Sequence, residues 1–223
     1  IFIEFFILAE DRMWAPIHKI LKQKAAQGVE VKVLYDDIGC MLTLPGDYHR
    51  TLRKWGIEAI PFSRLRGNAD SEFNNRSHRK ILVIDGKVGY TGGVNIADEY
   101  INVIERFGVW KDTGFRIEGD AVWSMSCTFI ETWEYVSRTK DDYQKYHPRY
   151  SVETDGLVQP YFDTPLDKNN LCENTYLSVI NNAKDYVYIA TPYLVIDNEM
   201  LTALTLAASS GVDVRIVVPG IPD

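Results

Sequence analysis

A short pattern occurs twice in this chain of 223 residues and constrains its fold more than any other feature. Residues 1–8 (IFIEFFIL) resemble residues 187–194 (VYIATPYL), and residues 28–34 (GVEVKVL) resemble residues 211–217 (GVDVRIV). Each copy is typical of an apolar strand, a helix that ends at a glycine, and a second strand. Such units pair their strands in parallel, so the repeat predicts an α/β fold built by duplication.

The rest of the chain continues this alternation of strands and helices. We expect the first copy to contain strands at 1–9 and 29–37 around a helix at 11–27. Further elements are predicted after it: a helix at 48–55, strands at 57–62, 78–85 and 112–119, and a helix at 120–135. The predicted fold is therefore a mixed or parallel sheet flanked by helices.

The repeat also predicts two lobes. Residues 1–150 would form a complete first lobe, and 151–223 a connector and the start of a duplicated second lobe. The polar, proline-containing segment 138–171 would join the two. The second copy reaches Asp223 before the equivalent of residue 78, so any second motif like the one described below would lie outside this sequence.

Composition excludes several classes of protein. With 46% apolar and 25% charged residues, the chain is not disordered, collagen-like or disulfide-rich. Cys40, Cys127 and Cys172 lie far apart, so we interpret them as reduced thiols in a cytoplasm-facing protein. A net charge of −7 argues against a wide nucleic-acid surface. No uncharged apolar run approaches the roughly 20 residues of a membrane span.

The motif most informative about chemistry starts at His78. Lys80 follows at i+2, Asp85 after four more residues, and Gly92, Gly93 and Asn95 after a further six. On a strand, the side chains of His78 and Lys80 point to one face. Gly92 and Gly93 would let the backbone approach an anion, and Asn95 could donate to it. A neutral imidazole nucleophile beside an ammonium suits a phosphodiester, without a metal or cofactor.

This motif, H-x-K-x4-D-x6-G-G-x-N, is similar to the signature of the phospholipase D superfamily. The flanking segments IEFFIL, LYDDIG (34–39), WKDTGFRIEG (110–119) and TPYLVID (191–197) resemble bacterial cardiolipin synthases. The resemblance implies a two-lobed fold whose single active site uses one motif from each lobe. This sequence departs from the superfamily pattern in two ways: Gly93 stands where many members have Ser, and the sequence contains only one motif.

Several residues of the motif also have structural interpretations. Asp85 belongs to the predicted catalytic set of the motif. Because it precedes Gly86 and Asp-Gly is a common turn pair, we favour a turn-forming role for it. Asn95 could cap a following helix as well as bind phosphate. The resemblance implies that a carboxylate near Asp112 orients the catalytic imidazole, and we favour this role for Asp112 over the alternative of an exposed aspartate at a strand edge.

Two further features bear on the substrate. Asp36 and Asp37 end a predicted strand, where carboxylates could hold a metal, but turn formation with Gly39 is the favoured interpretation. Residues 64–80 carry a net charge of +3, which fits the approach of an anionic headgroup. This charge comes from Arg64, Arg66, Arg76, Arg79 and Lys80 against Asp70 and Glu72. The aromatic residues of 120–135 are expected to pack in the core.

The resemblance implies phosphatidyl transfer between two phosphatidylglycerol molecules, making cardiolipin through a phosphohistidine on His78. The alternatives are a hydrolytic phospholipase D, another phosphodiesterase, or a non-catalytic phosphate-binding module. The expected partners are an anionic phospholipid and a membrane surface, with no nucleic acid. We expect the full-length protein at the cytoplasmic side of the cell membrane. The 223-residue chain alone is expected to be soluble, inactive and able to form a homodimer.

Overall fold

The computed structural model describes residues 1–63, 76–148, 152–153, 156–163 and 169–221. It divides into two compact units, Ile1–Pro160 (unit 1) and Tyr161–Asp223 (unit 2). Arg64, Arg66, Asp70 and Glu72 of the predicted basic segment lie outside the described residues, as does Pro165 of the predicted connector.

Unit 1 contains a six-stranded mixed sheet in the order β3-β2-β1-β4-β5-β6. The strands are β1 (Phe2–Phe5), β2 (Lys32–Asp36), β3 (Glu58–Phe62), β4 (Ile81–Ile84), β5 (Val88–Gly92) and β6 (Gly114–Glu118). β1, β2 and β3 run parallel, whereas β4 pairs antiparallel with β1, and β5 and β6 continue antiparallel. The predicted α/β class with a mixed sheet is confirmed.

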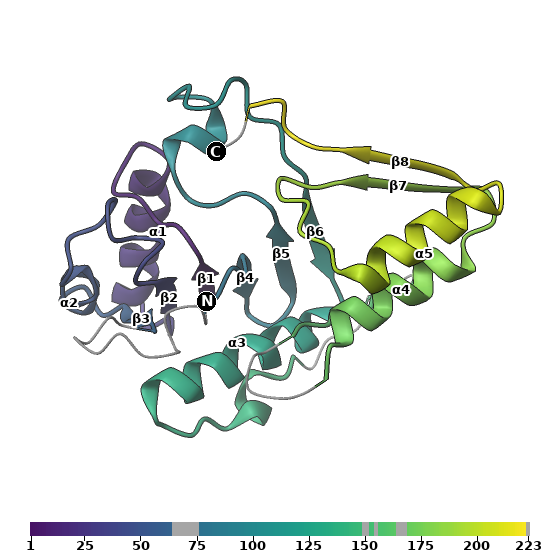
Figure 1. Ribbon diagram of the computed structural model, residues 1–223. Coiled ribbons are helices and arrows are strands. Elements are labelled where there is room, and N and C mark those ends of the chain that lie inside the picture. The colour runs from purple at the N-terminus through teal and green to yellow at the C-terminus, as the bar shows by residue number, and fades with distance from the viewer. Residues whose placement is uncertain (64–75, 149–151, 154–155, 164–168, 222–223) are drawn as a thin grey trace. The chain divides into compact units, whose positions relative to one another are not determined.

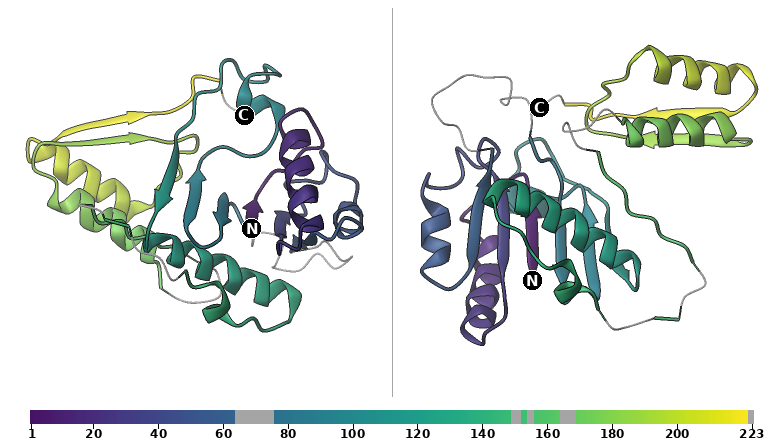
Figure 2. Two further views of the ribbon diagram at one scale, coloured as in Figure 1. Left: turned by 180° about the vertical axis from the view of Figure 1, so that it is seen from behind. Right: turned by 90° about the horizontal axis from the view of Figure 1, so that it is seen from below.

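Helices cover both faces of this sheet (Figures 1 and 2). The helices are α1 (Trp14–Ala26), α2 (Tyr48–Arg53) and α3 (Ala121–Ser137), with short 3-10 helices η2 (Asp98–Ile101) and η3 (Tyr143–Tyr146). One core joins α1 and α2 to the face that carries Ile3 and Val33. The other joins α3 to the opposite face through Phe2 and Leu34. Alternating side chains of the buried strands therefore supply both cores.

Two of the four aromatic side chains of α3 belong to the second core, so the prediction that they pack in the core is confirmed for half of them. Phe129 and Trp133 are buried, and the Phe129 ring stacks on Phe2 with 4.6 Å between centroids. Trp123 contacts the His147 ring, and Tyr135 is 39% exposed at the end of the helix. α3 thus anchors the sheet face opposite α1.

Unit 2 repeats the opening of unit 1. Its elements are α4 (Leu171–Asn182), β7 (Tyr186–Ala190), α5 (Asn198–Ser209) and β8 (Asp213–Val217). β7 and β8 pair in parallel with Tyr188 opposite Arg215, and β1 and β2 pair with Phe2 opposite Lys32. These are the pairs that the sequence repeat aligns, so the two copies share one register. That unit 2 begins a second lobe stays a prediction.

The structure adds two elements that the pattern did not predict. β5 contains two glycines and has no clear alternation of apolar side chains, but pairing with β4 and β6 fixes it as a strand. α4 begins at the end of the predicted connector, and only Ile180 among its residues is buried. Both elements depend on the segments that they pair or pack with, so the local pattern of apolar residues indicates them only weakly.

Candidate active site

His78 and Lys80 lie in the extended segment that leads into β4, three residues and one residue before its first residue, Ile81. The prediction of a strand starting at His78 is wrong at this end, although the chain there is extended enough to keep both side chains near each other. Because β4 runs antiparallel to β1, this segment lies where β1 and β2 end. Carboxyl ends of parallel strands are where open α/β sheets place ligands.

The two side chains are in direct contact. The Lys80 Nζ lies 3.1 Å from His78 Nδ1 and donates to the His78 carbonyl oxygen over 2.7 Å. The Phe6 ring, just after β1, lies 4.8 Å from the His78 ring and 5.8 Å from Lys80 Nζ. His78 is exposed, while Lys80 is only 5% exposed. An accessible imidazole therefore sits beside a largely desolvated ammonium.

Burial and proximity shift the pKa values of this pair. Burial lowers the Lys80 pKa to about 8, and the Asp112 carboxylate opposes the fall. Partial burial of the His78 ring, and then the Lys80 charge, lower its pKa below the ordinary 6.5. At neutral pH the imidazole is therefore neutral and the ammonium charged. This is the combination of a nucleophile with a charge-stabilising cation that phosphoryl transfer requires.

Asp112 is brought to this site, but not by a hydrogen bond to His78; none joins the two in the described part of the chain. The Asp112 Oδ2 accepts from Trp110 Nε1 over 3.0 Å, and its Oδ1 accepts from the Thr113 backbone N–H over 2.7 Å. Its negative charge raises the pKa of Lys80. The predicted contact with the imidazole is absent from this structure, and the observed electrostatic partner is Lys80.

Gly92 and Gly93 have no room for a side chain, and the approach of an anion to them stays a prediction. A Cβ on Gly92 would lie 2.4 Å from the Thr113 carbonyl oxygen. One on Gly93 would lie 2.3 Å from Asp112 Oδ1. The space above both glycines is therefore filled by residues 112–114, which lead into β6. A serine at Gly93 would displace the Asp112 carboxylate.

Asn95 is 3% exposed, and both the oxygen and the nitrogen of its side-chain amide make hydrogen bonds within the fold. Its Oδ1 accepts from the Ile7 backbone N–H over 3.0 Å, and its Nδ2 donates to the Tyr100 hydroxyl over 2.9 Å. The following 3-10 helix, η2, begins after Ala97, and no side chain caps it. The alternative helix-capping role of Asn95 is therefore wrong. A phosphate would have to use the second N–H of Nδ2.

The structure does not bring Asp85 to His78. Asp85 and Gly86 form the turn between β4 and β5, with φ values of 55° and 65° and a bond from Lys87 N to the Ile84 carbonyl. Two consecutive positive φ angles define a type I′ hairpin turn, which favours Asp-Gly. The whole of β4 separates this turn from His78. The observed place of Asp85 matches the turn-forming interpretation.

A buried network on the other side of the segment was missed by sequence reasoning. Glu4, 1% exposed on β1, accepts from Ser77 Oγ over 2.5 Å and pairs with Arg79 Nε at 3.4 Å. Arg79 also donates to Thr132 on α3 over 2.9 Å. Burial raises the Glu4 pKa, while Arg79 and Ser77 oppose the rise. A charged residue inside the apolar run 1–9 is the signal that could have found it.

Asp36, the last residue of β2, holds the segment that leads into β4 and carries His78. Its Oδ1 accepts from the backbone N–H groups of Ile38 and Gly39, at 2.9 and 3.0 Å, and its Oδ2 from that of Ser77 at 3.3 Å. The favoured turn interpretation of Asp36 and Gly39 thus agrees with the structure. Within the described ranges, no three His, Cys, Asp or Glu residues gather as a metal site.

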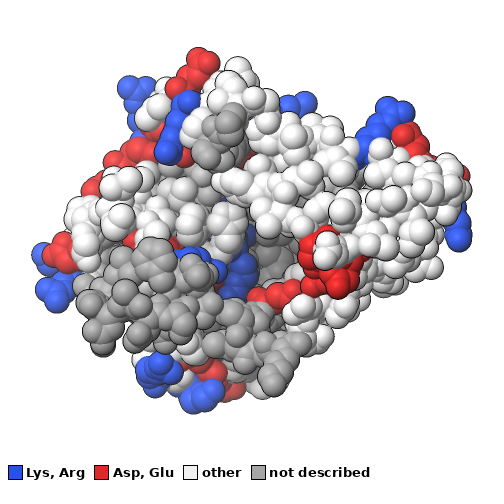
Figure 3. Space-filling model, in the orientation of Figure 1, with Lys and Arg blue, Asp and Glu red and all other residues white. Residues whose placement is uncertain are grey.

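Charge is distributed without a continuous basic surface over the face drawn in Figure 3, so far as its residues are described. Lys and Arg side chains there are interspersed with Asp and Glu. No helix in the part of the chain that the structure describes is long and apolar enough to cross a membrane.

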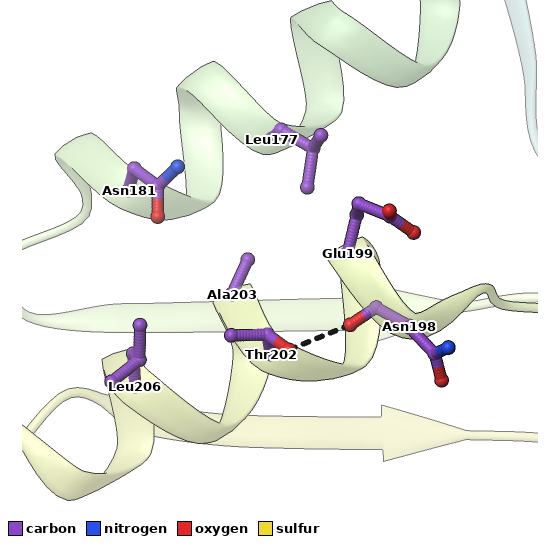
Figure 4. Close-up of a pocket in the computed structure, with 7 residues that line it drawn as sticks. All are labelled: Leu177, Asn181, Asn198, Glu199, Thr202, Ala203 and Leu206. Atoms are coloured by element: carbon purple, nitrogen blue, oxygen red, sulfur yellow. Dashed lines mark hydrogen bonds between the residues drawn. The ribbon is translucent and has the colours of Figure 1, made fainter.

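A groove of about 370 Å³ lies in unit 2, between α4 and α5 (Figure 4). Its lining includes Leu177, Leu206 and Thr202, whose hydroxyl donates to the Asn198 carbonyl. Its single ionisable lining residue is Glu199, and it contains no imidazole or ammonium. The candidate chemistry therefore belongs to the His78 segment of unit 1.

The sequence matches the family described as "Cardiolipin synthase, PLD-like domain" over residues 2–108 and 176–223. It is 49% identical over its full length to an uncharacterized protein of Streptococcus mutans, covering 49% of that protein. It is 39% identical over its full length to a cardiolipin synthase of Geobacillus thermodenitrificans, covering 45% of it. The chain thus spans about half the length of the curated relatives it matches.

The fold comparison agrees. The crystal structure of phosphatidylserine synthase from Haemophilus influenzae Rd KW20 matches 97% of this chain and 55% of that one. The TM-score is 0.66 at 15% sequence identity, which is a likeness of fold. The matched family segments cover the first strand–helix–strand unit with the His78 motif, and also its copy in unit 2. The chain belongs to the PLD-like domain family of the cardiolipin synthases.

Proposed function

We propose that this chain carries one half of a phosphatidyltransferase active site, which joins two phosphatidylglycerol molecules into cardiolipin. The single observation that carries the proposal is the contact between an exposed, neutral His78 and the buried ammonium of Lys80, 3.1 Å away. Family membership supports a phospholipid phosphodiester as the substrate.

The reaction proceeds in two displacements at phosphorus. An imidazole nitrogen of His78 attacks the phosphorus of the first phosphatidylglycerol, forming an N–P bond as the P–O bond to glycerol breaks. The glycerol alkoxide leaves with a proton from a general acid. A hydroxyl of the second phosphatidylglycerol then attacks the phosphohistidine, its proton returns to the acid–base group, and the N–P bond breaks. Lys80 stabilises the charge that develops on the equatorial oxygens.

The contact between Lys80 and His78 also gives the site a resting state. When the ammonium donates to Nδ1, the ring proton lies on Nε2, so neither nitrogen presents a free lone pair to a substrate. A phosphate that accepts from Lys80 Nζ draws the ammonium away from Nδ1. The imidazole then regains its nucleophilic lone pair as the substrate binds.

Exposed apolar side chains near the site support a lipid over a soluble phosphodiester. The segment from η2 to Trp110 exposes Val103 by 43%, Ile104 by 55% and Val109 by 86%. Trp110 bonds Asp112, so this segment adjoins the candidate phosphate site. Apolar side chains exposed together next to a phosphate site fit a ligand whose phosphate is joined to acyl chains.

The test is a transfer assay with phosphatidylglycerol vesicles, using the protein at the length of its relatives. His78→Ala should abolish cardiolipin and glycerol formation without loss of folding, because His78 is exposed. His147→Ala, an exposed histidine against Trp123, is the matched control and should retain activity. Phosphatidic acid as the main product would favour hydrolysis. Phosphate binding without any product would favour a binding module, and full activity of His78→Ala would contradict the nucleophile.

We further propose that residues 1–223 alone bind sulfate or phosphate but do not catalyse transfer. One motif supplies a nucleophile and one cation but no general acid, whose help is worth about 10²–10⁴-fold. Two copies of the chain could bring two His78 side chains together. Activity across a concentration series, beside sedimentation, separates the cases: turnover by a monomer would contradict the requirement for two motifs, and turnover rising with dimer would mean assembly in trans.

A further inference from the structure

We propose that Tyr100 and Trp110 are positioning residues that hold the Asp112 carboxylate in place beside Lys80. No hydrogen bond or ring contact joins either side chain to His78 or Lys80 in the described part of the structure, so both would act through Asp112. The inference concerns the same site as the proposed function and rests on it for the meaning of Lys80.

The arrangement starts from β1. Residue Ile7, two residues after that strand, donates its backbone N–H to Asn95 Oδ1 over 3.0 Å. The Asn95 Nδ2 donates to the Tyr100 hydroxyl over 2.9 Å. Because Asn95 is 3% exposed, this link is shielded from water and fixes the Tyr100 side chain against the central sheet.

Tyr100 in turn fixes Trp110. Their rings meet edge to face, 4.6 Å between centroids and 65° between planes. The Trp110 backbone is held by a pair of bonds with Asn102, from Trp110 N to Oδ1 at 2.6 Å and from Nδ2 to the Trp110 carbonyl at 2.9 Å. Both the ring and the backbone of Trp110 are therefore constrained within a loop that is otherwise exposed.

Trp110 then fixes the carboxylate. Its Nε1 donates to Asp112 Oδ2 over 3.0 Å, while the Thr113 N–H holds Oδ1 at 2.7 Å. The missing side chain of Gly93 leaves the room that both oxygens occupy. An exposed aspartate would ordinarily sample several rotamers. With each oxygen bonded, this one keeps its charge directed at one place.

The consequence falls on Lys80. It directly precedes Ile81, which pairs with Thr91 of β5. The residue after Thr91, Gly92, pairs with Gly114 of β6, two residues after Asp112, so the sheet brings Lys80 and Asp112 to the same end of these strands. Burial favours loss of the ammonium proton, and the Asp112 carboxylate favours its retention. A carboxylate free to rotate into solvent would support the ammonium less. Lys80 would then be deprotonated in a larger share of the molecules at the pH where it must bind phosphate.

The experiment measures the pKa of Lys80 directly in this chain. Lysine is labelled with 13C at Cε, the Lys80 resonance is assigned by its loss in Lys80→Arg, and its shift is followed from pH 6 to 11, a range chosen to bracket an amine titration. The variants are Trp110→Phe, which removes the N–H and keeps a ring, Tyr100→Phe, which removes the hydroxyl, and Asp112→Asn. Trp123→Phe, on α3, is the matched control.

We expect Asp112→Asn to lower the Lys80 pKa by roughly one unit, and Trp110→Phe to lower it by roughly half a unit. Tyr100→Phe should lower it by less, and Trp123→Phe should leave it unchanged. In the Asp112→Asn background, Trp110→Phe should add no further shift, because there is no charge left to position.

An unchanged Lys80 pKa in both Trp110→Phe and Tyr100→Phe, while Asp112→Asn shifts it, would overturn the proposal. An equal shift by Trp110→Phe with and without the Asp112 charge would overturn it too, since Trp110 would then act through structure alone. The titration requires no turnover, so it stays informative if the transfer reaction itself is not found. Transfer without any effect of Trp110 on Lys80 would contradict only the positioning role.

Discussion

The two strand–helix–strand copies pair their strands in the same register, yet one is buried on both faces and the other is not. In unit 1, Phe2 is 5% exposed and Leu34 1%. Their counterparts in unit 2, Tyr188 and Val217, are 56% and 65% exposed. The same local pattern thus ends in two different environments, and the difference comes from what packs around each copy.

Unit 1 contains α3 and β4, and the described residues of unit 2 contain no counterpart of either element. α3 covers the face of Phe2, and β4 adds Ile81 and Val83 to the same core. The segment before β4 carries His78 and Lys80. A strand–helix–strand unit alone therefore gives a scaffold, and the candidate chemistry comes with the strand that follows it. Glu4, which anchors that segment, is replaced in the copy by Ala190.

The largest expected effect is on stability. Phe2→Ala should lower the free energy of unfolding of unit 1 by about 3–5 kcal/mol, because it removes a buried ring stacked on Phe129. Tyr188→Ala, at the equivalent position of unit 2, should cost less than about 1 kcal/mol because its ring is exposed. Urea denaturation of both variants measures the contrast, and equal losses would show that the two faces are covered alike.

The next effect is on catalysis. Lys80→Met should lower the rate of transfer by about 10²–10³-fold, since it removes a charge placed at the developing oxyanions. Lys184→Met, an exposed lysine just before β7, is the control in the second copy and should retain the rate. The assay uses the protein at the length of its relatives. Normal transfer by Lys80→Met would mean that Lys80 is structural.

A smaller effect separates the cations at equivalent positions of the two copies, Lys32 in β2 and Arg215 in β8. Lys32 is 4% exposed, 2.5 Å from Asp141 and 3.2 Å from Glu30. Lys32→Met should destabilise unit 1 by about 1–3 kcal/mol, less than for a fully buried pair because both carboxylates are partly exposed. Arg215→Met, whose ion pair with Asp213 is exposed, should cost about 0–1 kcal/mol. Thermal unfolding of the two variants gives the comparison.

The smallest expected effect is a dependence on pH. Lys80 binds an anion as an ammonium, so sulfate affinity should be constant below its pKa of about 8 and fall as pH rises through it. The fall should approach about tenfold per pH unit well above that value. His78 does not interfere, since its pKa lies below 6.5 and it is neutral throughout this range. Calorimetric titrations should show this slope in the native chain and not in Lys80→Arg.

Much of the fold could be predicted because apolar periodicity and the repeat both reflect local structure. The repeat aligns Phe2 with Tyr188 and Lys32 with Arg215. Correspondingly, Phe2 pairs with Lys32 across β1 and β2, and Tyr188 pairs with Arg215 across β7 and β8. β5 was not predicted, because its glycines fit close contacts that only the folded protein creates, Gly89 with Met125 of α3 and Gly92 with Thr113 and Gly114. Nothing in the sequence near residue 1 indicates what the partner of Glu4 is.

The candidate site was predicted in part for the same reason. His78 and Lys80 are neighbours in sequence, so spacing alone brought them together. That Asn95 and Gly93 bind an anion stays a prediction, but the sequence did not indicate that Asn95 also holds Tyr100 or that Gly93 makes room for Asp112. The partners of these residues come from separate strands and loops, and pairing across the sheet decides them.

The central claim is that His78 attacks phosphorus, and trapping the covalent intermediate tests it most directly. The protein at the length of its relatives is mixed with 32P-labelled phosphatidylglycerol, quenched in alkali during the first turnover, and digested for mass spectrometry. Alkali is used because the N–P bond of phosphohistidine is acid-labile. We predict a phosphatidyl adduct on His78, absent from His78→Ala and present in His147→Ala. An adduct on another residue, or transfer by His78→Ala with no adduct on any histidine, would contradict the account.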